Sequence, residues 1–254
     1  MEKILEVNNL TKIFSRKGQG DYTAVNHIDF ELYQGECLGV IGESGSGKST
    51  TVNLITRLLD ATEGSIVLNG QDITHIKGRK LRRVYQDMQM VFQTSMESFD
   101  PRCTLGDGIA ESLRNNGWSK KDARLEVIEL LEKCGLNADF ADKYPHEVSG
   151  GQCQRAAIAR ALAIKPKLLI CDEATSALDV TIQQEILELL SELRMVHANE
   201  LSILFICHDI ALVQRFCDRV IVMHKGEIVE QGRPDEIIRN PKNDYTKSLL
   251  DSVL

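Results

Sequence analysis

Short apolar runs of strand length alternate with longer segments of helical periodicity along most of the chain. Apolar runs of roughly four to eight residues are typical of buried strands, and apolar residues recurring at every third or fourth position indicate helices. Strands and helices that alternate in this way predict an α/β fold with a mostly parallel sheet covered on both faces. The predicted strands are residues 37–41, 168–171, 201–207 and 219–223, and the predicted helical faces are Val52, Ile55, Leu58 and Leu59, and later Ile182, Ile186, Leu189 and Leu193.

Two regions depart from this alternation. In the first third of the chain, residues 65–68 lead into Asn69-Gly70, which is a strong signal for an antiparallel hairpin. From about residue 94 to residue 165 the strand signals fade, and we predict a helical insertion. One helix of this insertion is expected to begin at Ser119 with Asp122 three positions on, to present Leu125, Ile128 and Leu131 on one face, and to end at Gly135.

Composition narrows the possible functions. The 254 residues include 30 Lys and Arg against 37 Asp and Glu, so the formal charge is 30 − 37 = −7, which argues against nucleic acid as a partner. The apolar stretches fall far below the roughly 18 residues that span a bilayer, and the N-terminus lacks the pattern of a secretory signal. Seven cysteines without C-x-x-C spacing are expected to be structural.

The strongest chemical motif follows the first predicted parallel strand. Residues 42–49 match G-x-x-x-x-G-K-[ST] in full, between a strand and a helix. In such a loop, backbone N–H groups curl around a phosphate and the helix N-terminus adds partial positive charge. Lys48 would reach the β and γ phosphates, and the Ser49 hydroxyl would bind Mg²⁺. The residues predicted to contact ATP here are Gly42, Glu43, Ser44, Gly45, Ser46, Gly47, Lys48, Ser49 and Thr50.

Two further motifs follow. Asp172 and Glu173 end an apolar strand and point to opposite faces, so Asp172 can serve the Mg²⁺ shell while Glu173 activates the attacking water. The alternative is that the two carboxylates only cap the following helix. The phosphate loop in the same chain favours the catalytic interpretation. Residues 149–152, Ser-Gly-Gly-Gln, fit a capping box, and they equally fit a second anion site at a helix start.

Taken together, these motifs resemble the ATP-binding cassette of ABC transporters over nearly the whole chain. Residues 148–152 resemble its signature sequence, with Val148 where most members have Leu, and residues 176–179 resemble its D-loop. Gln93 resembles the Q-loop glutamine and His208 the H-loop histidine. The resemblance implies a RecA-like P-loop NTPase core, an antiparallel β subdomain and an inserted helical subdomain. Within a single domain over 1–254, the expected parts are 1–93 and 165–231 for the core and β subdomain, 94–164 for the helical subdomain, and 232–254 for a C-terminal segment.

The resemblance also implies roles for individual residues. Gln93 would complete the Mg²⁺ shell and His208 would contact the γ phosphate, acting beside Glu173 as the second catalytic residue. Phe14 resembles the aromatic that stacks on adenine, with Tyr22 as the alternative. Two cassettes would sandwich two ATP molecules, so one chain holds only half-sites. The signature and D-loop of each cassette would contact the ATP held by the other. In this chain the residues that would do so are Ser149, Gly150, Gly151, Gln152 and Asp179.

Finer patterns resemble the oligopeptide, dipeptide and nickel importer group. They are residues 90–93, 98–102, 177–180 and 208–213, together with 240–246, where Asn243 and Asp244 replace the group's His and Pro. The resemblance implies an ATPase at the cytoplasmic face of the membrane. Its partners would be a related, non-identical cassette, two permeases and, indirectly, an extracytoplasmic binding protein. Peptide import is expected; nickel or metal-chelate import is the alternative, and a non-transport ABC ATPase is less favoured.

The segment that follows Gln93 is expected to dock on a permease. Residues 94–104 contain Phe99, Pro101 and Arg102, an apolar and basic mixture suited to a partner helix. An ordinary surface loop is the alternative.

Overall fold

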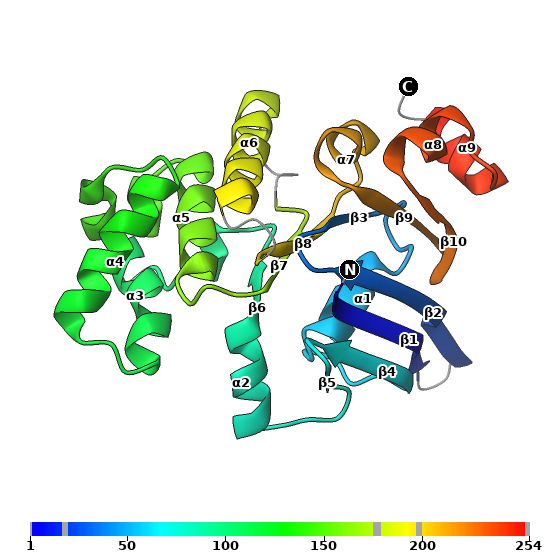
Figure 1. Ribbon diagram of the computed structural model, residues 1–254, viewed down its shortest axis with the longest axis horizontal. Helices are drawn as coiled ribbons and strands as arrows, with labels where there is room; N and C mark the ends of the chain where they lie inside the picture. The colour runs from blue at the N-terminus through cyan, green and yellow to red at the C-terminus, as the bar shows by residue number, and fades with distance from the viewer. Residues whose placement is uncertain (1, 17–19, 175–178, 197–199, 252–254) are drawn as a thin grey trace.

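Two sheets organise the structure, which is a computed structural model describing residues 2–16, 20–174, 179–196 and 200–251. The smaller sheet is antiparallel, in the order β2-β1-β4-β5, and the larger is six-stranded, in the order β10-β9-β3-β8-β7-β6 (Figure 1). The strands are β1 (Lys3–Arg16), β2 (Gly20–Tyr33), β3 (Cys37–Ile41), β4 (Glu63–Leu68), β5 (Gln71–Asp72), β6 (Met88–Val91), β7 (Leu168–Asp172), β8 (Ser202–Ile206), β9 (Arg219–His224) and β10 (Glu227–Gly232).

Five strands of the larger sheet run parallel, and β10 pairs antiparallel with β9. Alternate residues of these strands enter two different cores, because successive strand side chains point to opposite faces. Along β3, Leu38 and Val40 join a core with β1, β2, β4 and α1 (Lys48–Ile55), whereas Cys37 and Ile41 join a second core with the later helices. The parallel sheet is therefore buried on both faces, as the apolar runs predict.

Two hairpins have tight turns, and the one at Asn69-Gly70 was predicted. Asn69 and Gly70 have φ of 48° and 74° between β4 and β5, and Lys225 and Gly226 have φ of 48° and 84° between β9 and β10. Consecutive positive φ values are those of the tight turn that fits the twist of an antiparallel pair.

Helices between β6 and β7 gather at one side of the larger sheet (Figure 1). Thr104 and Ser119 each accept a hydrogen bond at a helix start, from Asp107 N and Asp122 N, so both helices begin at side-chain caps. The helices here are α3 (Leu105–Asn115), α4 (Lys120–Lys133) and α5 (Gly150–Leu162), with 3₁₀ turns at Met96–Ser98, Ala138–Asp142 and Pro145–Glu147.

The remaining helices are α2 (Arg79–Asp87), α6 (Val180–Val196), α7 (Ile210–Phe216), α8 (Pro234–Arg239) and α9 (Asp244–Asp251). Among the described residues, none of the helices combines the length and hydropathy that a membrane crossing requires.

Six of the seven cysteines are buried, as expected of structural residues. Burial raises the pKa of Cys207 to about 11, so this thiol stays protonated.

The apolar face expected on α4 is wrong in part. Leu125 is 54% exposed, while Ala123, Val127 and Leu130 are buried with Leu131. The buried side is the one that α3 and α5 cover, and a segment with apolar residues on several sides does not by itself specify which side that is. Similarly, α1 ends at Ile55, and Leu58 beyond it is 58% exposed.

Phe99 is not a docking side chain. It is 4% exposed, its ring packs 4.2 Å from the Arg160 guanidinium, and a Cβ on Gly108 would lie 2.7 Å from Phe99 Cδ1. The expectation of a surface anchor therefore fails at this residue, because the ring fills a gap between α3 and α5. The exposed apolar side chains near Gln93 are instead Phe92 and Met96, at 41% and 44%.

Phe99→Ala should consequently lower the free energy of unfolding by about 3–5 kcal/mol, the usual range when a buried phenylalanine is truncated. Urea unfolding monitored by circular dichroism measures this. Phe92→Ala is the matched control, expected to lower stability less than Phe99→Ala does, because Phe92 is 41% exposed and less apolar area is lost from the packed interior. Equal stability of the two variants would contradict the packing of Phe99.

Candidate active site

The predicted catalytic motifs meet at one edge of the larger sheet. Strands β3, β8, β7 and β6 are neighbours and parallel, so their carboxyl ends lie together. The phosphate loop follows β3, His208 follows β8, Glu173 follows β7 and Gln93 follows β6. Gln93 and His208 are both exposed. Ligands of open α/β sheets bind at this edge, outside the carboxyl ends of the strands.

Glycines shape the loop between β3 and α1. Gly42 has φ of 151°, and a Cβ there would lie 2.2 Å from the Met223 carbonyl oxygen. Gly47 has φ of 107°, and a Cβ there would lie 2.7 Å from the Ala24 carbonyl oxygen. Both positions exclude any side chain, so the backbone can curl tightly and present its N–H groups at the start of α1. Such a helix N-terminus favours an anion.

The Lys48 side chain folds back onto the backbone of the phosphate loop. It is 5% exposed, and its Nζ donates hydrogen bonds to the carbonyl oxygens of Gly42 at 2.7 Å and Glu43 at 3.0 Å. Burial lowers the pKa of Lys48, and the negative charges of Glu173 and Asp172 oppose that shift. A phosphate arriving at the loop would therefore give this buried ammonium a charged partner, and the ammonium has three N–H donors, of which the two carbonyls use two.

Asp172 has the properties of a cation ligand. Its Oδ1 is buried and has no hydrogen-bond partner among the described residues. Burial raises the pKa of this carboxyl, the charge of Glu173 raises it further, and Lys48 opposes the shift. A divalent cation beside Asp172 would satisfy the orphaned oxygen and favour the ionised carboxylate. The site therefore fits a bound Mg²⁺.

Glu173 has an unusual backbone conformation. Its φ is 48°, in the left-handed region that a residue with a Cβ rarely adopts, and its N–H donates to the Ile206 carbonyl oxygen at 3.1 Å. Such strain persists where surrounding structure imposes it, and it concentrates at functional sites. Here it places the residue at the wall of a hollow beside the phosphate loop.

This hollow has a volume of about 190 Å³. Tyr22 lines this hollow and is 44% exposed. Phe14 is the residue opposite Tyr22 in the β1–β2 pair, and it is not among the described residues that line the hollow. The structure thus favours Tyr22 over Phe14 as the aromatic beside a bound nucleotide. Sequence reasoning missed Ala24, which gives no chemical signal. The lining residues are Tyr22, Ala24, Ser44, Gly45, Gly47, Lys48, Ser49, Thr50 and Glu173.

The residues that resemble the signature sequence lie away from the phosphate loop in the structure. Ser149 and Gln152 form the capping box of α5, with Gln152 N donating to Ser149 Oγ at 3.3 Å and Ser149 N to Gln152 Oε1 at 2.9 Å. Gly150 begins the helix, and a Cβ on Gly151 would lie 2.7 Å from Ile182 Cγ2. Ser149, Gly151 and Gln152 line a second hollow, and none of them lines the one at the phosphate loop in the described structure.

Of the predicted D-loop residues, Asp179 is the one that the structure describes. Its Oδ1 accepts a hydrogen bond from Ile182 N at 3.0 Å, and its carbonyl oxygen accepts one from Gln183 N at 2.9 Å. Asp179 therefore holds the start of α6. Residues 176–178 lie outside the described residues.

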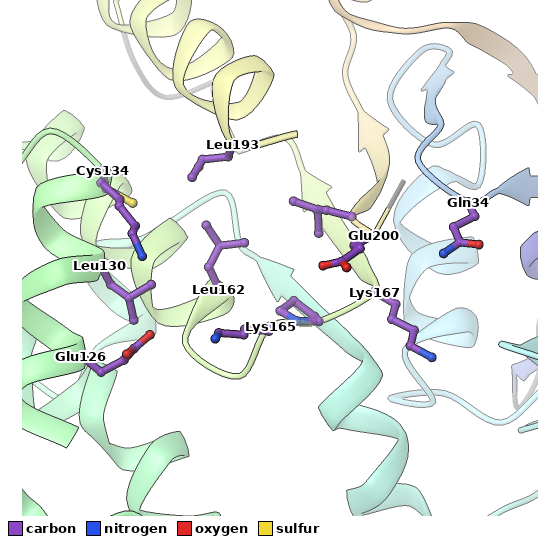
Figure 2. Close-up of a pocket in the computed structure, with 12 residues that line it drawn as sticks. Gln34, Glu126, Leu130, Cys134, Leu162, Lys165, Lys167, Leu193 and Glu200 are labelled. Atoms are coloured by element: carbon purple, nitrogen blue, oxygen red, sulfur yellow. The ribbon is translucent and has the colours of Figure 1, made fainter. Parts of the chain in front are cut away.

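A larger hollow of about 340 Å³ lies at the opposite edge of the sheet. Figure 2 shows Leu130, Leu162 and Leu193 facing the space between the helical part and the sheet. Lys167 precedes β7 and Leu201 precedes β8, so this hollow is at the amino ends of the strands. It is thus separate from the catalytic motifs.

A glycine loop entering a helix, a buried lysine and a strand ending in Asp-Glu define a P-loop nucleoside triphosphatase. The chain belongs to the ABC transporter family, whose model matches residues 25–176, and it is an ATP-binding, ATP-hydrolysing protein of that family. The α/β fold with a RecA-like core, an antiparallel β subdomain and an inserted helical subdomain is thereby confirmed.

Curated relatives cover almost the whole chain. It is 45% identical to the oligopeptide transport ATP-binding protein OppF of Bacillus subtilis, over 99% of this chain and 83% of that protein. It is 43% identical to the dipeptide transport ATP-binding protein DppF of Lactococcus lactis, over 99% and 81%. The glutathione import ATP-binding protein GsiA of Shigella dysenteriae is 46% identical over 99% of this chain and 41% of its own length.

Solved structures agree on the fold. The dimeric ATP-binding cassette MJ0796, in a post-hydrolysis state bound to ADP and Pi, superposes with a TM-score of 0.82 at 29% identity, covering 91% of this chain and 98% of that one. CbiO1 of Clostridium perfringens, part of the ABC transporter complex CbiONQ, superposes with a TM-score of 0.83 at 29% identity, covering 94% and 92%.

Proposed function

We propose that this chain is the ATPase subunit of a peptide importer and works at the cytoplasmic face of the membrane. The observation that supports peptides is the similarity to oligopeptide and dipeptide transport subunits over nearly the full chain. Nickel or metal-chelate import is the alternative within the same group. Substrate choice would rest with the permeases and an extracytoplasmic binding protein.

In the proposed reaction, the N–H groups of the loop and the Lys48 ammonium hold the β and γ phosphates of ATP. Glu173 accepts a proton from the water that attacks the γ phosphorus, and His208 contacts the γ phosphate. Ser49, Asp172 and Gln93 would hold Mg²⁺, which supplies charge neutralisation at the phosphate oxygens. ADP and phosphate leave as products, and Tyr22, which lines the hollow, is proposed in place of Phe14 to stack on the adenine.

The proposed assembly contains a second, related but non-identical cassette and two permeases. Its support within this chain is that the signature residues and the phosphate loop line separate hollows. Ser149, Gly150, Gly151, Gln152 and Asp179 would then face the nucleotide of the partner cassette.

Uptake measurements test the proposed substrate. In cells that lack this chain, restoring it should restore uptake of a radiolabelled tripeptide, and restoring the Glu173→Gln variant should not, because uptake requires hydrolysis. Radiolabelled nickel is measured in parallel. Restored nickel uptake without peptide uptake would replace the peptide assignment, and failure of the chain to co-purify with membrane proteins would contradict a transport function.

A further inference from the structure

The C-terminal segment contacts the first turn of the phosphate loop. The hydroxyl of Tyr245, the second residue of α9, accepts a hydrogen bond from the backbone N–H of Glu43 at 3.0 Å. The Tyr245 ring packs against the ring of His224, at the end of β9, with centroids 3.8 Å apart and planes inclined by 32°. A residue about 200 positions later in the chain thus holds the loop backbone directly.

Other contacts fix Tyr245 in this position. The two carboxylate oxygens of Glu230, on β10, accept hydrogen bonds from Lys242 N at 2.9 Å and Asn243 N at 3.1 Å. The Asn243 side chain in turn accepts one from Tyr245 N at 2.9 Å. The backbone leading into α9 is therefore tied to the edge strand, so the tyrosine is positioned before any ligand arrives. Burial raises the pKa of Tyr245, which keeps the phenol neutral.

The Glu43 peptide is held on both sides. Its N–H donates to Tyr245, and its carbonyl oxygen accepts from Lys48 Nζ and from Ser46 N. Farther along the loop, the Ser46 carbonyl oxygen accepts from Gly226 N at 2.8 Å. If a phosphate drew the Lys48 ammonium away from Glu43, the bonds to Tyr245 and from Gly226, both outside the loop, would still hold the loop backbone.

We propose that Tyr245 is a positioning residue of the nucleotide site, whose hydroxyl fixes the Glu43 peptide and so preorganises the phosphate loop. The proposal rests on the proposed function, because its effect is on ATP. A loop fixed before binding loses less conformational freedom when it closes on phosphate. The loop contacts phosphate in the ground state and the transition state alike, so its positioning acts on affinity more than on turnover.

Tyr245→Phe tests this with the ring retained. The Kd of the full chain for ATP, and the KM of the assembled transporter, should rise about 2- to 10-fold, the equivalent of one neutral hydrogen bond. The kcat should stay within about twofold, since uniform binding is what is lost. Amide exchange in the nucleotide-free chain is the direct readout: the Glu43 N–H should exchange faster in the variant.

Tyr85→Phe is the matched control. The Tyr85 hydroxyl also bonds to the backbone, but as a donor, to the Thr56 carbonyl oxygen at 3.0 Å, at the far end of α1. If Tyr245 had only a structural role, both variants would have lower stability than the wild type and an unchanged Kd for ATP. Unchanged Kd and Glu43 exchange in Tyr245→Phe, beside normal ATP binding by the wild type, would overturn the inference alone. No ATP binding by the wild type would overturn the proposed function and the inference with it.

Discussion

Lys48→Ala should raise the Kd for ATP by at least about 100-fold, because charge-assisted hydrogen bonds contribute about 1.5–3 kcal/mol each and this residue would make them to two phosphates. The effect on stability without nucleotide has two separate parts. Burial lowers the pKa of Lys48, which means that the buried ammonium is unfavourable in the nucleotide-free fold relative to the unfolded chain. Removal of the charge itself should therefore not lower the melting temperature without nucleotide, and any fall should come from the lost hydrogen bonds to the Gly42 and Glu43 carbonyls.

Isothermal calorimetry with ATP measures the affinity, and thermal unfolding measures the stability. Lys77→Ala is the control, since the Lys77 side chain is 75% exposed and lies on the surface, where its contact with Asp60 is worth little. ATP affinity within a few-fold of the wild type in Lys48→Ala would contradict the placement of this ammonium at the phosphates.

Glu173→Gln should reduce ATP hydrolysis about 10²- to 10⁴-fold, the usual effect of removing a positioned general base, while the Kd for ATP stays the same. The amide has nearly the shape of the carboxylate and cannot accept the proton of the attacking water. Phosphate release by the assembled transporter measures the rate. Glu192→Gln, the same change at an exposed position of α6, should leave the rate unchanged. Equal hydrolysis by Glu173→Gln and the wild type would remove Glu173 from the role of base.

The same variant distinguishes the possible partners. ATP that cannot be hydrolysed should accumulate in the closed sandwich of two cassettes. With ATP, light scattering on Glu173→Gln alone should show mainly monomer if the partner must be a related, non-identical chain. A stable dimer of this chain alone would show that a second copy suffices.

The place of the proposed site in the fold was predictable from sequence because each motif is local. Residues 42–49 specify a turn, a helix start and an ammonium within eight positions, and the turn closes only where glycine is present. Asp172 and Glu173 follow a strand of apolar residues, which placed them at the carboxyl end of a buried strand. Parallel strands then bring these motifs to one edge, and this follows from alternation of strands and helices alone.

Burial and long-range contacts could not be predicted in the same way, because they depend on which other segments cover a residue. Phe99 was expected at the surface and is buried against Arg160, and Leu125 was expected in the core and is exposed. Likewise, residues 240–246 resembled a group pattern without a stated role. Only the packing of α9 against β9 and β10 brings Tyr245 to the Glu43 backbone. The sequence by itself determined the fold class and which residues are proposed as catalytic, since both depend on local spacing, and the tertiary structure alone decided which side chains support them.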